Sequence, residues 1–442
     1  MPLQSALVDS SVNTADAMDF RLTDEQLTFQ RTCREFAAEV IRPAAERYDR
    51  EQEVPWDVLR EARRRNMYGL DLIQQFATDG MAAVLYAEEM HWGCAGIALA
   101  LSASSLAAAG IASAGTPDQL AQWVPQCYGI GDDDIKLGAY AVTEPQAGSD
   151  VKSLRTTAKR DGDDWILNGT KVFISNGGIA DVTVVVATVD PELGHRGQAS
   201  FIVEKDTPGF SLGKKEDKMG IRASQTGELV LEDVRVPMDH LLGGLEKLER
   251  KLERGRTGEQ SRSSGALATF ETTRPIVGAG ALGIARAAYE WTLDFLEGRQ
   301  DNGEPLLEQQ RVQQVLADVA MELDAARLLV YRAAWMSRSG MPMTAGQGSM
   351  SKLKAGEVAM WCTTALMELV GPEAASEDHP MQKYFRDAKI FQLFEGTSQI
   401  QRLVIARMQT AERRKDRAEA ADEAPGEGAA DGPVSEPAPA TA

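Results

Sequence analysis

Apolar residues in the first part of the chain recur at the spacing of amphipathic helices, from Phe36 through to Leu85. Thr23 followed by Gln26 predicts a capping box at the start of this pattern. We therefore predict an N-terminal helical domain over residues 20–138.

The pattern changes near Ala139, where β-branched residues become dense and short apolar runs are bounded by Gly, Asp, Asn and Pro. This pattern predicts a central β domain over residues 139–242. The expected strands cover residues 165–167, 172–174, 182–189, 200–203 and 228–231.

The rest of the chain divides into three further segments. Residues 243–266 form a charged insert or linker, with a short exposed helix followed by a mobile link. Residues 267–411 return to helical spacing, most clearly over 312–334, and predict a C-terminal helical bundle. Residues 412–442 lack aromatic and large apolar side chains, which is typical of a disordered tail. The order helix, β, helix predicts a multi-domain α+β fold.

Charge excludes some partners. The formal net charge is -19, which argues against nucleic acid and disfavours an anionic membrane surface. It does not exclude an anionic small molecule, because a local basic pocket can exist in an acidic protein. Residues 92–117 are uncharged and long enough to span a bilayer. They consist mostly of Ala, Ser and Gly, so we predict a buried, close-packed helix and no membrane partner.

The cysteine and histidine positions argue against cross-links and metals. The four cysteines and four histidines are scattered, with no CxxC pair and no metal-ligand spacing. The N-terminus has no basic start followed by an apolar run. We expect a cytoplasmic protein with no metal site.

Four stretches carry the chemistry: AYAVTEPQAGSDV (139–151), NGTKVFISNGGIAD (168–181), MGIRASQTGELVLEDVRVP (219–237) and RDAKIFQLFEGTSQIQRLVIAR (386–407). In this order and spacing they closely resemble the acyl-CoA dehydrogenase family, and the resemblance covers about residues 22–408. It implies a helical N-terminal domain, a central β domain and a C-terminal four-helix domain, with FAD bound between the last two. It also implies α,β-dehydrogenation of an acyl-CoA to a trans-2-enoyl-CoA in fatty acid metabolism, electron transfer to an electron-transferring flavoprotein, and a homotetramer.

Glu395 matches the family's catalytic base. The α-proton of a thioester is weakly acidic, so its removal needs a base against the carbon and a donor for the enolate oxygen. The apolar run IFQLFEG around Glu395 would raise the pKa of the carboxyl group and make it a better base near neutral pH. The resemblance implies that the N–H of Glu395 helps to hold the enolate oxygen. It also assigns Gly396 to the substrate, and Thr397 and Gln399 to the cofactor. The alternative is that Glu395 is a solvated acid at a helix end.

Two segments of the β domain match the family's flavin contacts. Val142, Thr143 and Ser149 lie in the first, and Phe173, Ile174 and Ser175 lie in the second. Hydroxyl and backbone donors suit the polar edge of a flavin ring, and Phe173 can pack on its face. Alternatively, these are turn and strand residues of a β domain.

Further residues match substrate positions. Ser149 matches a position that also touches the acyl-CoA, and Arg274 matches an arginine close to base and thioester. Alternatively, Arg274 is an ordinary surface arginine. Glu271 and Thr273 lie where some relatives carry their base; Thr273 cannot serve, and Glu271 is a weak fallback.

The sequence departs from the family where its C-terminal domain reaches across a subunit interface to the FAD diphosphate and adenine. In the first element Arg299 and Gln310 match, but Asn302 replaces an aromatic residue and Asp301 adds an acid.

The second element aligns with residues 368–374. There Glu368 replaces an amide, Glu373 adds an acid, Pro372 removes an N–H and Ala374 limits close approach. A carboxylate beside a diphosphate is repulsive by roughly 1–4 kcal/mol per close pair. The N-terminal domain also has LDLIQQFATDG, residues 70–80, in place of the family's Gly-Gly loop.

Three interpretations follow from these departures. FAD binds despite the altered clamp; or a related chain in a mixed oligomer supplies the clamp; or FAD is lost, and the fold does non-redox proton chemistry or serves in assembly. We favour the first, with an acyl group carried either by CoA or by an acyl-carrier protein.

Overall fold

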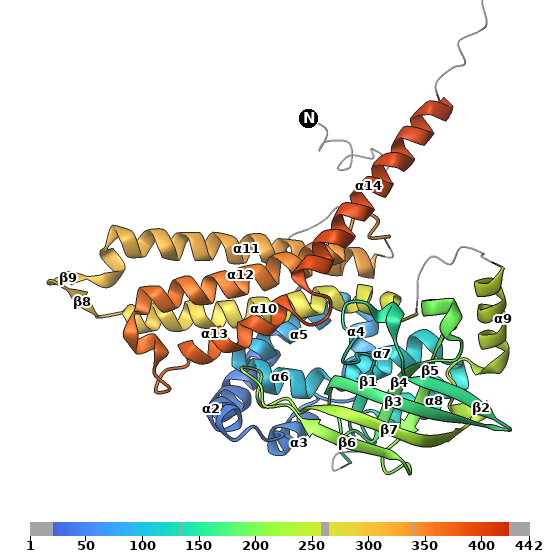
Figure 1. Cartoon of the computed structure of the whole chain (residues 1–442). Coiled ribbons are helices and arrows are strands. Elements are labelled where there is room, and N and C mark those ends of the chain that lie inside the picture. The colour runs from blue at the N-terminus through green and yellow to red at the C-terminus, as the bar shows by residue number, and fades with distance from the viewer. Residues whose placement is uncertain (1–20, 132–133, 258–264, 340, 424–442) are drawn as a thin grey trace, which may run out of the picture.

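The computed structural model describes residues 21–131, 134–257, 265–339 and 341–423. Figure 1 shows a sheet-containing part with the N-terminal helices against it, and a long helical bundle that extends away from the sheet. This is the expected multi-domain α+β fold, with helical, β and helical domains in sequence order.

The N-terminal domain begins with a helix whose first turn is capped as expected. Thr23 Oγ1 accepts the Gln26 N–H at 3.2 Å, and Gln26 Oε1 accepts the Thr23 N–H at 3.1 Å. The helices are α1 (Asp24–Phe36), the π-helix η2 (Ala37–Ile41), α2 (Arg42–Glu51), α3 (Trp56–Arg64), α4 (Leu70–Thr78), α5 (Gly80–Gly93), α6 (Ala95–Ser102), α7 (Ser104–Ala114) and α8 (Pro117–Gln126). Helix α4 takes up most of the segment that departs from the family's Gly-Gly loop.

The uncharged stretch expected to be buried is buried. Its helical part, Ala95–Ala114, is long and apolar enough to cross a membrane, but 67% of it lies inside the protein. It is divided at Ala103 into α6 and α7, and α7 packs on strand β1 (Gly138–Ala141). Gly110 allows this packing, since an added Cβ would lie 2.7 Å from the Tyr140 ring.

The β domain is one seven-stranded sheet with the order β1-β4-β2-β3-β7-β6, and β5 pairs with β4. The remaining strands are β2 (Thr157–Asp161), β3 (Asp164–Ser175), β4 (Val182–Thr188), β5 (Gln198–Glu204), β6 (Phe210–Lys215) and β7 (Thr226–Pro237). The prediction of separate strands at 165–167 and 172–174 is wrong, because both belong to β3. Asn168 and Gly169 make an irregularity within that strand instead of a turn, and Asn168 Oδ1 accepts the Asp233 N–H at 2.8 Å.

Helix α9 (Gly244–Arg256) is the expected short charged helix, and the link predicted after it falls largely on residues 258–264, outside the described residues. The C-terminal helices are α10 (Gly265–Leu296), α11 (Gln310–Arg338), α12 (Gln347–Val370), α13 (Met381–Lys389) and α14 (Ser398–Glu423). A hairpin of β8 (Gln300–Asp301) and β9 (Glu304–Pro305) joins α10 to α11. The short helices are η3 (Val151–Ser153), η4 (Pro191–Gly197), η5 (Met238–His240), η6 (Leu306–Glu308), η7 (Pro372–Ala375) and η8 (Ile390–Gln392).

Helix α14 continues to Glu423, past residue 411 where the bundle was expected to end. Charged residues that we assigned to a disordered tail therefore extend the helix, and Figure 1 shows this part leaving the bundle. The rest of the expected tail, residues 424–442, lies outside the described residues.

Buried charges join the N-terminal domain to the bundle. Glu88 and Glu89 of α5 are 1% and 2% exposed, and both pair with Arg286 of α10, at 3.0 Å for Glu88. Arg327 of α11 also reaches Glu88 at 3.0 Å. Burial alone would lower the pKa of Arg286, but the two glutamates keep it fully charged and raise that pKa. These contacts fix α10, which carries part of the site, against the N-terminal domain.

Candidate active site

Glu395 lies on a strained turn between η8 and α14. Its φ is 54° and that of Gly396 is 89°, so two successive residues adopt the left-handed conformation. This conformation is unfavourable for a glutamate and easy for a glycine. An added Cβ on Gly396 would lie 2.5 Å from Gln401 Nε2, so the Gln401 amide would have to move from its place against the turn.

Two buried side chains hold the carbonyl groups of this turn. Lys352 Nζ donates to the Gly396 carbonyl at 2.8 Å. Gln401 Nε2 donates to the carbonyls of Glu395 at 3.1 Å and of Gly396 at 3.2 Å. Within the described part of the chain, the N–H of Glu395 donates to no protein acceptor.

The Glu395 carboxyl group is half-buried and has a strongly shifted pKa. Burial raises this pKa from 4.5 to about 7, while Lys352, Thr273 and Arg274 act in the opposite direction. Thr273 Oγ1 donates to Glu395 Oε2 over a long 3.5 Å. A carboxyl group with a pKa near neutrality is suited to accepting a proton, and Glu395 is not the fully solvated acid of the alternative reading.

Arg274 is not a surface arginine. It is 4% exposed near the start of α10, and its Nη1 donates to Ser349 Oγ at 2.9 Å. Its charge acts on Glu395, so the two residues expected to flank the thioester lie together. The side chain of Glu271, the fallback base, lies outside the described residues.

The remaining residues of the Glu395 motif differ in exposure. Thr397 caps α14, since its Oγ1 accepts the Ile400 N–H at 3.2 Å. Gln399 is exposed. These positions give a structural role to Thr397 in addition to the expected cofactor contact.

The β-domain segments meet at one edge of β3. The Val172 N–H donates to the Thr143 carbonyl at 2.9 Å. Val142 and Ile174 are buried, so only their backbone groups can face a ligand, whereas Ser149 is exposed and Thr143 and Ser175 are half-buried.

Phe173 is the unusual residue of this edge. Its φ is 58° and 65% of it is exposed, at a register shift between Lys171 and Ile174. A large apolar side chain held outward on a strained backbone is a feature that a ring-stacking ligand would explain.

A buried ion pair fixes this edge. Lys171 Nζ donates to Glu144 Oε1 at 2.8 Å and to the Val142 carbonyl at 2.9 Å, and both charged side chains are at most 2% exposed. Glu144 also accepts the N–H groups of Arg155 and Thr156. Burial alone would raise the pKa of Glu144, but Lys171 and these donors lower it to about 2.

The residues expected to contact the FAD diphosphate and adenine lie far from Glu395. Arg299 follows the end of α10, 25 positions after Arg274, which corresponds to roughly 35–40 Å at the rise of an α-helix. Its guanidinium donates to both carboxylate oxygens of Glu373, at 2.9 and 3.1 Å, and lies 3.6 Å from the centre of the Phe295 ring. His379 Nε2 lies 3.7 Å from the same carboxylate.

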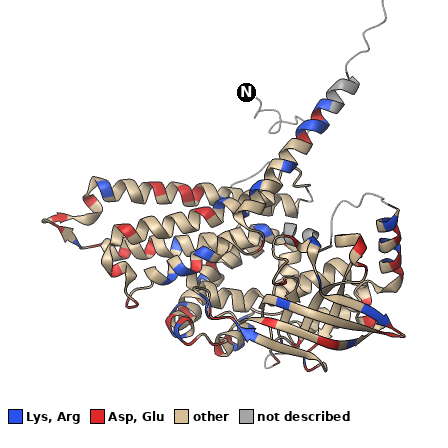
Figure 2. Cartoon of the chain, viewed as in Figure 1, with Lys and Arg blue, Asp and Glu red and all other residues tan. Residues whose placement is uncertain are grey.

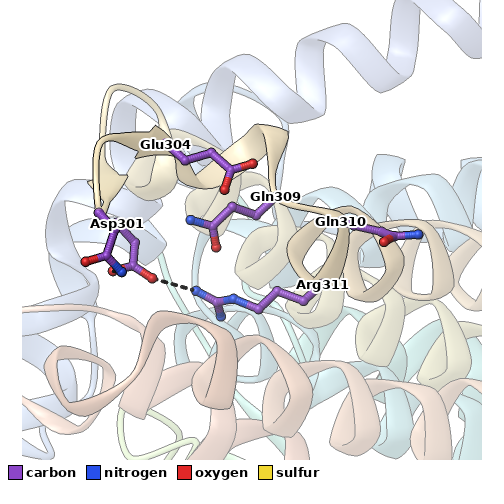
Figure 3. A pocket seen from close by; sticks show the side chains of 6 residues that line it. Asp301, Glu304, Gln309, Gln310 and Arg311 are labelled. Atoms are coloured by element: carbon purple, nitrogen blue, oxygen red, sulfur yellow. Dashed lines mark hydrogen bonds and ion pairs between the residues drawn. The ribbon is translucent and has the colours of Figure 1, made fainter.

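The hairpin beside Arg299 carries a shallow polar pocket. Asp301, Glu304, Gln309, Gln310 and Arg311 line it, together with Asn302 (Figure 3). Arg311 lies 3.6 Å from Asp301. Figure 2 shows acidic positions at this hairpin, so both described arginines at this end already face a carboxylate.

Comparison with known proteins decides the family. Three family models match the chain: the acyl-CoA dehydrogenase N-terminal domain over residues 23–129, the middle domain over 139–234 and the C-terminal domain over 264–410. The chain belongs to the acyl-CoA dehydrogenase family.

Relatives of this acyl-CoA dehydrogenase agree along most of its length. The mitochondrial short-chain specific acyl-CoA dehydrogenase of Bos taurus is 37% identical over 389 residues, covering 87% of this chain and 90% of that protein. The structure of butyryl-CoA dehydrogenase from Megasphaera elsdenii has a TM-score of 0.78 and 36% identity, covering 88% and 99%. A chain in the structure of the electron transferring flavoprotein of Acidaminococcus fermentans has a TM-score of 0.78 and 34% identity, again covering 88% and 99%.

FAD is the cofactor of this family, and the two groups of expected contacts fit it unequally. The edge around Thr143 and Phe173 fits the ring end, because it presents half-buried polar groups beside an exposed aromatic face. At the end around Arg299 the guanidinium is paired with Glu373, so a diphosphate there would meet a carboxylate beside the arginine.

Sequence reasoning missed the residues that hold the site. Lys352 and Gln401 fix the turn of the base, and Glu144 and Lys171 fix the edge of β3. No local motif marks them, because each acts on a segment that only folding brings close. Among the described residues, no group of three or more His, Cys, Asp or Glu could hold a metal.

Proposed function

We propose that this acyl-CoA dehydrogenase removes the α-proton of a saturated acyl thioester with the Glu395 carboxylate. The observation that carries the proposal is a half-buried carboxyl group with a pKa raised to about 7, held on a strained turn by two buried side chains. Such a group is a stronger base than a solvated glutamate, and with a pKa of about 7 it is about half ionised at pH 7 and largely ionised at pH 8.

The turn also offers a donor for the enolate oxygen. Because the Glu395 N–H donates to no acceptor among the described residues, it is left for a substrate oxygen. Buried Arg274 adds positive charge beside the carboxylate and the thioester. Thr143, Ser149, Phe173 and Ser175 would hold FAD, which would supply the acceptor for the β-hydride.

The electron acceptor is an electron-transferring flavoprotein, and the substrate is an acyl-CoA or acyl-carrier thioester. The family assignment and the flavoprotein-related structure support this part of the proposal.

The test separates proton removal from hydride transfer. With butyryl-CoA as the probe, Glu395→Gln should lose turnover and exchange of the α-proton with deuterated water, by about a thousandfold or more. Glu232→Gln, which removes an exposed glutamate from β7, is the control and should retain both. Full exchange by Glu395→Gln on a substrate that wild type turns over would exclude Glu395 as the base.

A second candidate is a subunit of a mixed oligomer. It is favoured by the Arg299–Glu373 pair, which lies roughly 35–40 Å from the base along α10 and so cannot complete the same chain's site. In a homotetramer every site would meet this neutralised arginine, whereas a related chain could supply an open one. About one flavin per two chains, with a second protein present, would support the mixed oligomer; about one per chain in pure protein would support the homotetramer.

A further inference from the structure

Lys352 is a buried lysine whose position the proposed reaction has not yet explained. It lies on α12, is 1% exposed and makes no ion pair with a described residue. Lysine is rarely buried without a charged partner. Its ammonium group instead donates to a backbone carbonyl, that of Gly396, at 2.8 Å.

The surroundings of Lys352 show what its charge acts on. Burial lowers its pKa to about 8, and Glu395 offsets this most among its neighbours. Arg274 of α10 lowers the pKa further, whereas Glu357 of α12 raises it. The charged groups that act on the Glu395 carboxyl are therefore Lys352 and Arg274, with Thr273 as a neutral donor.

We propose that Lys352 is a positioning residue for the base: its ammonium group holds the Gly396 carbonyl and so fixes the turn that directs the Glu395 carboxylate. This inference rests on the proposed function of Glu395.

The geometry explains why such a contact is needed. A glutamate in the left-handed conformation is unfavourable and persists only where neighbouring groups determine it. Gln401 comes from α14, directly after the turn, and can move with it. Lys352 comes from α12, a separate helix of the bundle, so it alone of the two fixes the turn relative to the bundle that carries Arg274 and Ser349.

The charge of Lys352 gives a second role that a purely structural contact would lack. A cation close to a half-buried carboxyl group favours its ionised form. Removing the cation should therefore leave Glu395 protonated to a higher pH.

The experiment compares Lys352→Met, Lys352→Arg and the control Lys354→Met, with butyryl-CoA as substrate and ferricenium as acceptor. Lys354 lies two residues away and pairs with Glu322 at the half-exposed surface. For Lys352→Met we expect kcat at pH 7 to fall about tenfold to a hundredfold. We also expect the acid limb of its pH profile to move up by about one unit. Lys352→Arg should restore the limb, and Lys354→Met should change neither. An unmoved limb in Lys352→Met, or loss of activity alone, would overturn the proposal.

If Lys352→Met does not fold, Lys352→Gln replaces it, because the amide can still donate but carries no charge. The acid limb of the pH profile of kcat should then move to higher pH in Lys352→Gln and stay in place in Lys352→Arg. Identical pH profiles for the two variants would contradict the inference.

A readout without turnover keeps this test separate from that of the proposed function. The difference in thermal midpoint between each variant and the same variant with Glu395→Gln, followed from pH 5 to 9, reports the ionisation of Glu395. Lys352→Met should shift that curve to higher pH even if Glu395 is not the base. No shift would show that Lys352 does not act on the carboxyl group.

Discussion

Two ion pairs in this protein, Lys171–Glu144 and Arg299–Glu373, lie where FAD is expected to bind. They have opposite consequences for the residues that should contact the cofactor. The Lys171–Glu144 pair is at most 2% exposed and lies behind the β3 edge. The Arg299–Glu373 pair is 42% and 51% exposed and lies at the end of the bundle. The first pair supports Thr143 and Phe173, the residues expected to face the ligand, from behind. The second occupies the residue that should itself face the ligand.

The effect of an ion pair on ligand binding therefore depends on whether one of its two side chains is itself a ligand contact. A pair between two supporting residues leaves the ligand contacts open, whereas a pair that includes the ligand contact competes with the ligand. The two ends of this acyl-CoA dehydrogenase therefore differ in whether the expected ligand contact is left open, although both retain residues that match the family.

The largest expected effect is the loss of stability when the buried Lys171–Glu144 pair is broken. Lys171→Met leaves Glu144 buried without its cation, so the free energy of unfolding should fall by about 3–5 kcal/mol. Denaturant unfolding followed by tryptophan fluorescence measures this change. Lys214→Met, which breaks the exposed pair with Glu216 in the same domain, should change it by less than about 1 kcal/mol. Equal effects would contradict the contrast between buried and exposed pairs.

The next effect is a pH dependence of stability caused by Glu395. The folded protein keeps this proton up to pH about 7, whereas the unfolded chain releases it near 4.5. The neutral carboxyl group therefore contributes stability at low pH that is lost as the pH rises through about 7, by about 2–3 kcal/mol in total. Glu395→Gln should remove this loss and be the relatively more stable protein at pH 8. Parallel stability curves from pH 5 to 8 would show that the pKa of Glu395 is not raised.

A smaller effect is expected at the exposed pair. Glu373→Gln releases Arg299 and removes a negative charge, so FAD should bind about three- to tenfold more tightly, an effect of about 1 kcal/mol. Titration of the apoprotein with FAD, followed by flavin fluorescence, measures the affinity. Glu377→Gln changes an exposed acid near the same loop and serves as control. Weaker binding by Glu373→Gln would mean that the pair supports the cofactor site.

The smallest expected effect is that of Arg299 on FAD affinity, and it shows whether this arginine binds the cofactor or only its partner Glu373. Arg299→Gln should change the FAD affinity of the wild type by less than about twofold, because Glu373 already neutralises Arg299. In the Glu373→Gln background the same change should cancel the gain in affinity. A loss of tenfold or more in the wild type would show that Arg299 holds FAD despite its partner.

Much of the fold followed from the sequence. Local sequence patterns are sufficient to predict the three domains, the capping box at Thr23 and the buried stretch at residues 92–117. Asn168 and Gly169 misled the strand prediction, because these residue types mark turns more often than irregularities within a strand.

The site was predicted only in part. The motif around Glu395 predicted this residue as the base, which stays a prediction, and its apolar neighbours indicated the direction of its pKa shift, which the structure confirms. The sequence also showed that Glu373 adds an acid, but not that it pairs with Arg299, 74 positions away. Lys352 was missed for the same reason, since its partner Gly396 lies 44 positions along the chain.

The left-handed backbone at Glu395 bears on how this residue is maintained. Glutamate is poorly suited to that conformation, and its carboxyl group is also partly desolvated, so glycine at position 395 would relieve both burdens. A single base change converts a glutamate codon into a glycine codon. Random mutation therefore offers a ready route to a more stable, inactive protein. The chain with glutamate at position 395 is therefore less stable than the same chain with glycine there, but only the first carries a carboxylate on this turn.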